Sequence, residues 1–346
     1  MKAFNWALLS SYALLAATSP IERIKLQRDS VDLDTFKLYA QYSGAAYCNS
    51  QMANGATITC SNNVCPDVTS AGATVQATFS GSDTDLQGFV AVDPGHQAVV
   101  VSMRGSSSLD NFITDFEFFQ EDCPLVSGGQ VHIGFAKAWD EVSSSVLAAL
   151  QTATAANPSY RIVFTGHSLG AAVSSLGAAY ARAQGYAVDI INFGSPRFGN
   201  DILADFVTNQ AGIEWRMTHL NDPVPRLPPI LFNYRHTSPE YWLSNGEDDT
   251  DDYTASDVKV CDGNANIVCN AGTFGLDIIS HLNYLGQISG CNALEFIFKR
   301  DLAEENLQSR NEDYYWYLAT APANSVSEDE LTSKVNEWAA QDMAAN

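Results

Sequence analysis

The stretch Arg161-Ile162-Val163-Phe164-Thr165-Gly166-His167-Ser168-Leu169-Gly170-Ala171-Ala172 decides the fold. Apolar residues typical of a buried strand lead into a G-x-S-x-G pentapeptide, and small helix-forming residues follow it. A serine at such a junction sits in a tight, strained turn, and its flanking glycines let the strand and the helix approach closely. The new helix directs N–H groups toward a developing oxyanion. We therefore predict that Ser168 is a nucleophile; the alternative is a fortuitous glycine–serine turn at a strand end.

The segments around this stretch alternate between strand and helix patterns. Strands are expected over Ala73–Phe79, Gln87–Asp93, Ala98–Met103, Tyr160–Thr165, Val188–Phe193 and Glu214–His219, and helices over Val31–Tyr47, Ile133–Ala156 and Leu169–Gln184. Strands that alternate with long helices indicate an α/β fold, with a mostly parallel sheet and helices on both faces. A further short helix is expected near the C-terminus, because Ser327-Glu328-Asp329-Glu330 is a capping box ahead of Leu331, Val335 and Trp338.

The net charge of the chain excludes some classes of binding partner. Among 346 residues, 18 are Lys or Arg and 40 are Asp or Glu, which gives a net charge of −22. Nucleic acid is an unsuitable partner for such a chain, since phosphate binding needs clustered cations. An anionic membrane surface is disfavoured for the same reason, whereas a neutral lipid surface is not. We expect a monomer, because a large net charge keeps molecules apart. We expect no transmembrane segment, because no apolar run reaches 18 residues.

The N-terminus has the layout of a secretory signal. Lys2 precedes an apolar run from Trp6 to Ala17 and a cluster of small residues, and Pro20–Arg28 then resembles a short basic propeptide. We expect residues 1–28 to be removed and the protein to be secreted into the extracellular medium. The alternative is a buried N-terminal helix.

Seven cysteines fit an exported protein, because disulfides persist in oxidising surroundings. No CxxC pair occurs and the histidines are not near the cysteines, so zinc is not expected. The acidic segment Gly246–Asp257 is read as a solvated loop, since it lacks the Gly and Glu positions of an EF-hand. We therefore predict no metal site and no cofactor.

A serine nucleophile needs a general base and an acid that orients the base. In folds with this turn, the acid and then the histidine follow the serine along the chain. The downstream acids at plausible strand ends include Asp201, Asp205 and Asp222, whereas Asp189 lies inside an expected strand and fits worse. The downstream histidines are His219, His236 and His281. Asp222 lies in the loop that follows the expected strand Glu214–His219, where a carboxylate can hold a fixed position. Spacing alone does not choose among the histidines.

Several motifs in register resemble the class 3 fungal triacylglycerol lipases and the feruloyl esterases of the same family. They are Tyr42-Ser43-Gly44-Ala45-Ala46-Tyr47-Cys48, Arg104-Gly105-Ser106, Gly166–Gly170, Asn221-Asp222-Pro223-Val224-Pro225-Arg226-Leu227-Pro228-Pro229, Ser238-Pro239-Glu240-Tyr241-Trp242 and His281-Leu282-Asn283-Tyr284-Leu285-Gly286. The resemblance implies an α/β-hydrolase fold over 29–291, with 292–346 as an acidic extension of unknown role. It also implies that His132 and His167 are structural neighbours of the site.

Carried over residue by residue, the resemblance makes Ser168 the nucleophile, Asp222 the orienting acid and His281 the base. Ser106 and Leu169 then form the oxyanion hole. The disulfides it implies are Cys48–Cys291, Cys60–Cys65 and Cys261–Cys269. Cys123 stands where relatives have a cysteine pair, but its near neighbour is absent, so it is predicted to be free.

The segment 107–116 corresponds to the lid of the relatives. Leu109, Phe112, Ile113 and Phe116 are spaced as one apolar face of a short helix, which favours a lipase that works at an oil–water interface. By the same resemblance, feruloyl esterase lids are more polar. The expected activity is hydrolysis of triacylglycerol esters through an acyl-enzyme. The alternatives are a feruloyl esterase, a phospholipase A1, or a secreted binding protein on a catalytically inactive hydrolase fold.

Overall fold

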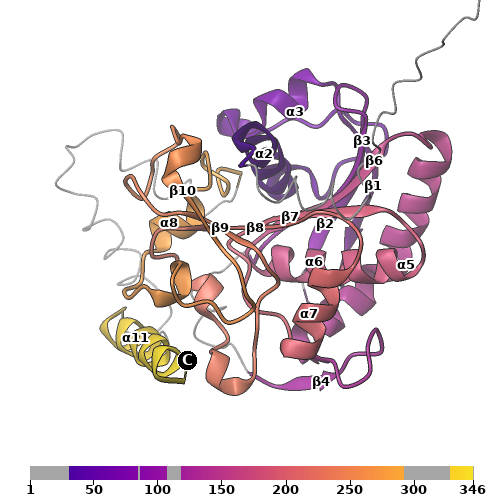
Figure 1. The fold of residues 1–346 in the computed structure, drawn as a ribbon. Helices are drawn as coiled ribbons and strands as arrows, with labels where there is room; N and C mark the ends of the chain where they lie inside the picture. The colour runs from indigo at the N-terminus through magenta and orange to yellow at the C-terminus, as the bar shows by residue number, and fades with distance from the viewer. Residues whose placement is uncertain (1–30, 85, 107–117, 292–327, 346) are drawn as a thin grey trace, which may run out of the picture.

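The computed structural model describes residues 31–84, 86–106, 118–291 and 328–345 (Figure 1). Its helices are α2 (Leu33–Asn49), α3 (Pro66–Ser70), α5 (Ile133–Ala156), α6 (Leu169–Ala183), α7 (Asp201–Asn209), α8 (Ile278–Leu282) and α11 (Glu328–Ala345). Its strands are β1 (Thr74–Ser80), β2 (Gln87–Asp93), β3 (Ala98–Met103), β4 (Gln120–Asp122), β5 (Gln130–His132), β6 (Arg161–His167), β7 (Val188–Phe193), β8 (Glu214–His219), β9 (Glu240–Leu243) and β10 (Val258–Cys261). The predicted signal and propeptide, residues 1–28, and the predicted lid side chains Leu109, Phe112, Ile113 and Phe116 lie outside these residues.

The strands form an eight-stranded sheet in the order β1-β2-β3-β6-β7-β8-β9-β10. From β3 to β9 each neighbouring pair is parallel, while β1, β2 and β10 extend the two edges in antiparallel fashion. This is the mostly parallel sheet predicted from the alternation of strands and helices. Because the carboxyl ends of parallel strands meet at one edge, residues that follow β3, β6 and β8 gather there.

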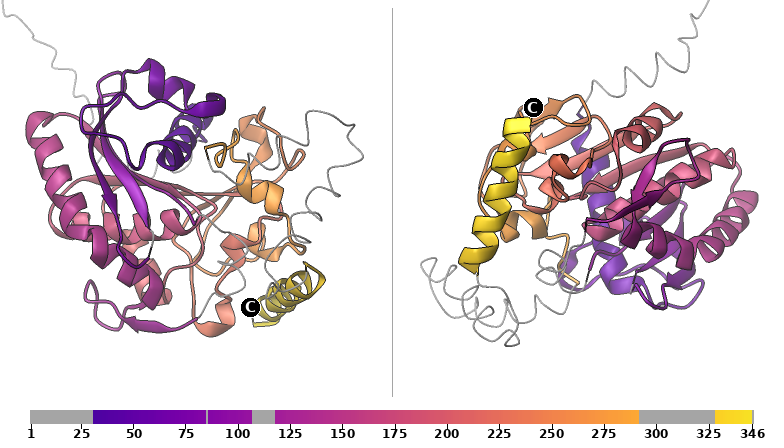
Figure 2. Two further views of the ribbon diagram at one scale, coloured as in Figure 1. Left: turned by 180° about the vertical axis from the view of Figure 1, so that it is seen from behind. Right: turned by 90° about the horizontal axis from the view of Figure 1, so that it is seen from below.

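Two apolar cores lie on the two faces of the sheet. Along β3, Val99 and Val101 belong to the core that includes the side chains of α5 and α6, whereas Val100 belongs to the core that includes those of α2. The alternation follows from the two-residue period of a strand. Figure 2 shows α2 apart from α5 and α6, with the sheet between them. The prediction of helices on both faces is therefore confirmed.

The sequence patterns located the long elements well and missed several short ones. The bounds expected for β2, β3, β7, β8 and α5 are those observed. The helix α7, the hairpin strands β4 and β5, the strand β9 and the edge strand β10 were not predicted. Glu240 in β9 explains one omission: it is buried and pairs with Arg216 at 3.1 Å, so the strand lacks a continuous apolar run.

Candidate active site

Ser168 lies at the turn between β6 and α6, in a strained backbone conformation. Its φ of 56° falls in the left-handed region, which non-glycine residues adopt only where the surrounding structure requires it. Two glycines make the turn sterically feasible. A Cβ on Gly166 would lie 2.6 Å from the carbonyl carbon of Gly170, and a Cβ on Gly170 would lie 2.2 Å from the carbonyl oxygen of Met103. The strand–turn–helix context expected for the pentapeptide is therefore present.

Asp222 and His281 meet on the side of the sheet where β8 ends. Nδ1 of His281 lies 2.9 Å from Oδ1 and 2.8 Å from Oδ2 of Asp222. The two residues are 59 positions apart in sequence and both are buried. Since a carboxylate only accepts hydrogen bonds, the His281 proton is on Nδ1 and Nε2 is left to accept a proton from another group. This is the orientation that a general base requires.

The pair adjoins the turn that holds Ser168. Ser168 N–H donates to the carbonyl of Phe193, and a Cβ on the next residue, Gly194, would lie 3.1 Å from both Oδ2 of Asp222 and Nδ1 of His281. Oγ of Ser168 and Nε2 of His281 are both buried, and within the described part of the chain neither has a hydrogen-bond partner. The structure thus brings Asp222 and His281 together beside Ser168, although it does not give a hydrogen bond between Ser168 and His281.

One predicted oxyanion residue, Leu169, directly follows the serine, and the other, Ser106, follows a glycine that lies close to it. Leu169 is the first residue of α6, where a backbone N–H has no acceptor within its own helix. Ser106 follows Gly105, and a Cβ on Gly105 would lie 3.0 Å from Cβ of Ser168. The chain that leaves β3 therefore passes directly beside the turn that holds Ser168.

His167 connects this strand end to the His281 backbone. Its Nε2 donates to the carbonyl of His281 at 2.8 Å, so Nδ1 is the bare nitrogen and accepts from the Tyr47 hydroxyl at 2.8 Å. The same hydroxyl oxygen accepts from Gly105 N–H at 3.2 Å. Burial, with a smaller contribution from His281, lowers the pKa of His167 well below its usual range. A neutral imidazole is what this hydrogen-bond chain requires.

Tyr284 and Asn270 contribute to the site, and sequence reasoning assigned a role to neither. The hydroxyl of Tyr284 donates to Oδ2 of Asp222, and burial, reinforced by the Asp222 charge, raises the pKa of Tyr284 well above its usual range. The Asn270 side chain donates to the carbonyls of Leu220 and Asp222, each at 3.0 Å. Tyr284 lies in the family motif His281–Gly286, so the motif was a sequence signal for its role. No sequence signal pointed to Asn270.

The rival acids and histidines have other partners. Asp201 begins α7, and Asp205 accepts from the Asn264 side chain at 2.8 Å. His219 is buried between the carbonyls of Ser280 and Asn283 and the Tyr253 hydroxyl, and His236 donates to the carbonyl of Pro225 at 2.6 Å. Among the described residues, neither histidine has a hydrogen bond to a carboxylate that would orient it as a base.

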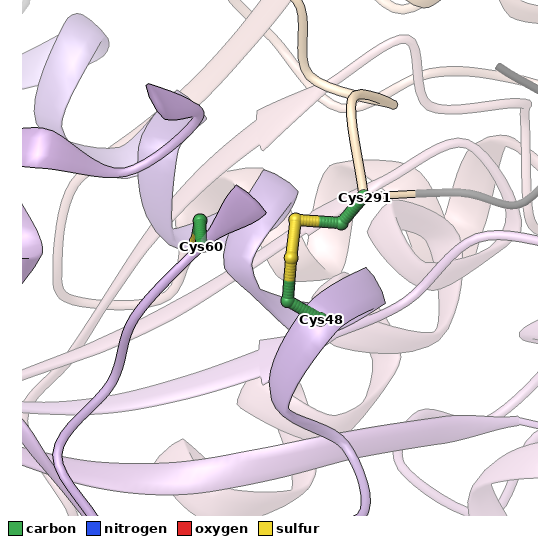
Figure 3. A group of neighbouring side chains, drawn as sticks. All are labelled: Cys48, Cys60 and Cys291. Carbon is green, nitrogen blue, oxygen red and sulfur yellow. A yellow bond between two sulfur atoms is a disulfide. The ribbon is translucent and has the colours of Figure 1, made fainter. Parts of the chain in front are cut away.

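Six cysteines form the disulfides Cys48–Cys291, Cys60–Cys65 and Cys261–Cys269, and Cys123 is buried as a free thiol. Figure 3 shows Cys60 near the Cys48–Cys291 bond, and the sulfurs of these three residues lie within 4.8 Å of one another. All three are oxidised, so they offer no thiolate to a metal ion.

Comparison with known proteins identifies the family. The family model for class 3 lipases matches residues 100–232, and that for the lipase 3 N-terminal region matches residues 8–77. A secreted mono- and diacylglycerol lipase 1 of Fusarium solani is 46% identical over 314 residues, which cover 88% of this chain and 94% of the relative. A lipase of Rhizomucor miehei is 32% identical over 268 residues, 75% of this chain and 70% of that one.

Solved structures agree with this assignment. The mono- and diacylglycerol lipase of Aspergillus oryzae superposes with a TM-score of 0.71 at 39% identity, covering 76% of this chain and 99% of the other. An MDLA mutant from Penicillium cyclopium gives a TM-score of 0.71 at 38% identity, covering 75% and 100%. The chain belongs to the class 3 lipase family. It has the α/β-hydrolase fold and is a secreted carboxylic ester hydrolase. No helix in the described ranges has the length and apolar character needed to cross a membrane.

Proposed function

We propose that the protein hydrolyses the ester bonds of acylglycerols, with Ser168 as nucleophile, His281 as general base and Asp222 as the acid that orients it. The observation that carries the proposal is the pairing of Nδ1 of His281 with Asp222 beside the strained turn of Ser168. Relatives named as mono- and diacylglycerol lipases support acylglycerols as the substrate class.

The reaction proceeds in two acyl transfers. His281 Nε2 takes the Ser168 proton as Oγ attacks the ester carbonyl, and the backbone N–H groups of Ser106 and Leu169 stabilise the resulting oxyanion. His281 then protonates the leaving glycerol oxygen, which breaks the ester bond and leaves an acyl-serine. Water repeats the sequence and releases the fatty acid. These steps use only side chains and backbone groups of the chain and water.

Exposed apolar side chains on the segments that follow the predicted lid and Asp222 suit a neutral lipid phase. Phe119, Leu231 and Phe232 are 64%, 54% and 45% exposed, and Phe232 contacts Phe118 with ring centroids 5.1 Å apart. We propose that these side chains meet the oil–water interface together with the predicted lid of 107–116. The net charge of −22 favours an uncharged surface over an anionic one.

A substrate panel tests the proposal. Purified wild type and Ser168→Ala are compared on tributyrin, a diacylglycerol, a monoacylglycerol, phosphatidylcholine and methyl ferulate. We expect acylglycerols to be the best substrates and Ser168→Ala to lose several orders of magnitude in rate, since the members of a triad act as one unit. Methyl ferulate or phosphatidylcholine as the best substrate would replace the proposal with the corresponding alternative. More than about a tenth of wild-type activity in Ser168→Ala would exclude this serine as nucleophile.

A further inference from the structure

Helix α11 lies beyond Cys291, the last residue of the predicted hydrolase domain, yet it packs against that domain. Figures 1 and 2 show it along the segments that follow β8, and its residues contact Ile230–Phe232 and Asn270–Gly272. Its buried residues, Leu331, Val335, Ala339 and Asp342, are spaced as one helical face. Leu331 and Val335 belong to the same apolar core as Val224 and Leu227. The helix therefore covers the segment that directly follows Asp222.

Asp342 contacts that segment directly at Leu231 and, through Arg197, at Arg226 and Pro228. Its Oδ2 accepts from Nη1 of Arg197 at 3.0 Å, and its Oδ1 accepts from Leu231 N–H at 3.2 Å. Nη1 of Arg197 also donates to the carbonyls of Arg226 and Pro228, at 2.7 and 2.8 Å. Burial lowers the pKa of Arg197 to about 10, while the Asp342 charge acts in the opposite direction. A buried guanidinium needs such a partner, so this contact fixes α11 in place.

Asn336 holds the segment that leads to His281. Its Oδ1 accepts from Gly275 N–H at 2.6 Å. On the inner side, the Arg226 guanidinium donates to the carbonyls of Thr273 at 2.9 Å and Asn221 at 3.1 Å, and also to the carbonyl of Gly275. Gly275 is thus hydrogen-bonded through its N–H to Asn336 of α11 and through its carbonyl to Arg226. Arg226 in turn donates to the carbonyl of Asn221, the residue before Asp222.

We infer that α11 positions the two segments that carry Asp222 and His281, with Asn336 and Asp342 as positioning residues. The inference rests on the proposed function, because it assigns α11 a role in the geometry of the proposed triad. A base and its orienting acid must be held within about 0.5 Å of their productive arrangement. The loops that follow Asp222 and precede His281 are irregular, and α11 contacts both. The other reading of the same contacts is that α11 only covers apolar surface.

Asn336 offers a clean test because it is half-buried on a helix and alanine is a good helix former. Asn336→Ala removes the acceptor for Gly275, Asn336→Asp keeps one, and Ser333→Ala changes an exposed residue of the same helix as the control. For each variant, kcat and KM are measured on p-nitrophenyl butyrate, and active sites are counted with a serine-directed phosphonate. We expect kcat per titrated site to fall roughly 10- to 100-fold in Asn336→Ala, because small displacements remote from the reacting atoms have effects of this size.

KM should change by less than about twofold in Asn336→Ala, and Asn336→Asp and Ser333→Ala should retain kcat near the wild-type value. Asp342→Asn supplies a second variant, which keeps an acceptor for Leu231 N–H but removes the charge opposite Arg197. It should lower kcat per titrated site as well. If Asn336→Ala and Asp342→Asn lower the melting temperature but leave kcat per titrated site unchanged, the inference is overturned. Helix α11 would then only cover apolar surface. Equal losses in Asn336→Ala and Asn336→Asp would also overturn it. Failure of the proposed function is distinguishable, because wild type would then neither turn over acylglycerols nor be labelled at Ser168.

Discussion

The hydroxyl of Tyr284 donates to Oδ2 of Asp222, the oxygen that also lies 2.8 Å from Nδ1 of His281. Oδ1 accepts from Val224 N–H at 2.9 Å and faces the same Nδ1 at 2.9 Å. The carboxylate therefore accepts a hydrogen bond on each oxygen from a group other than His281. A carboxylate with two such partners cannot rotate away from the His281 imidazole without losing hydrogen bonds.

Tyr284→Phe tests the contribution of this hydroxyl. Removing a hydrogen bond to a charged group should lower the free energy of unfolding by about 1.5–3 kcal/mol. We also expect kcat/KM on p-nitrophenyl butyrate to fall, because the acid loses part of its fixed orientation. The matched control is Tyr253→Phe, which removes a buried hydroxyl 2.7 Å from Nε2 of His219. The control should lose stability and keep kcat/KM; equal losses of kcat/KM in both variants would contradict the assignment.

Gly105→Ala should disturb the oxyanion side of the site. The added Cβ would lie 2.3 Å from the Tyr47 hydroxyl and 3.0 Å from Cβ of Ser168, so the end of β3 must shift. A shift of this kind is expected to reduce kcat by about tenfold or more. Gly81→Ala serves as the control, since its Cβ would meet the side-chain oxygens of Glu141 and Thr84. Measured kcat values that are alike in the two variants would argue against a role for this strand end.

Unfolding of the protein should become easier in mild acid. Burial, together with the charges of Arg216 and Arg197, lowers the pKa of His236 well below its usual range. As the pH falls through about 6.5, the unfolded chain therefore takes up a proton that the folded chain does not, and stability is lost. The loss for this residue amounts to at most about 1.4 kcal/mol per pH unit.

Urea denaturation between about pH 5 and about pH 7 measures this slope. The pKa values of His167 and His219 are also lowered by burial, so they contribute with the same sign. His236→Gln, which retains a donor for the carbonyl of Pro225, should show a shallower slope than wild type. An unchanged slope would mean that His236 takes up its proton in the folded protein too.

A single thiol, Cys123, should react only after unfolding. The residue is buried, and burial raises the pKa of its thiol, so little reactive thiolate forms in the native protein. Thiol titration should give about one group per chain in denaturant and almost none without it. Peptide mapping without reduction identifies the residue, and Cys123 found in an intrachain disulfide would contradict the expectation.

Phe232→Ser should weaken activity on emulsions more than activity on dissolved esters. Phe232 is 45% exposed on the segment that follows Asp222, and transfer of a large apolar side chain to an oil phase contributes about 1.5–3 kcal/mol. Val268→Ser is the control, because Val268 is 62% exposed next to the Cys261–Cys269 disulfide, in a different surface loop. Rates on tributyrin above and below its solubility limit give the comparison. Equal emulsion rates for Phe232→Ser and wild type would remove this side chain from the interface.

How far the sequence alone predicted this protein depended on how local each signal was. The turn at Ser168 needs only a strand, a pentapeptide and a helix in succession, and the sequence pattern predicted this succession directly. The choice of Asp222 and His281 depends on two loops that are 59 residues apart in sequence and meet in space. Residue spacing could not identify this pair, whereas the family resemblance did. These roles, and those of Ser106 and Leu169, stay proposals. Arg197 was not singled out at all, since its partner Asp342 lies 145 residues away.

The Cys48–Cys291 bond closes the hydrolase part of the chain into a covalent ring, and the C-terminal helix α11 lies outside this ring in sequence. Its two cysteines are 243 residues apart, so β1 to β10, Ser168, Asp222 and His281 all lie inside the ring. One peptide bond cut between Asn49 and Gly290 opens the ring without releasing a fragment. A secreted protein meets proteases, and exposed acidic residues such as Glu247 and Asp249 lie in a surface loop of that ring. A nicked molecule would therefore migrate as one species until a reductant separates its two pieces.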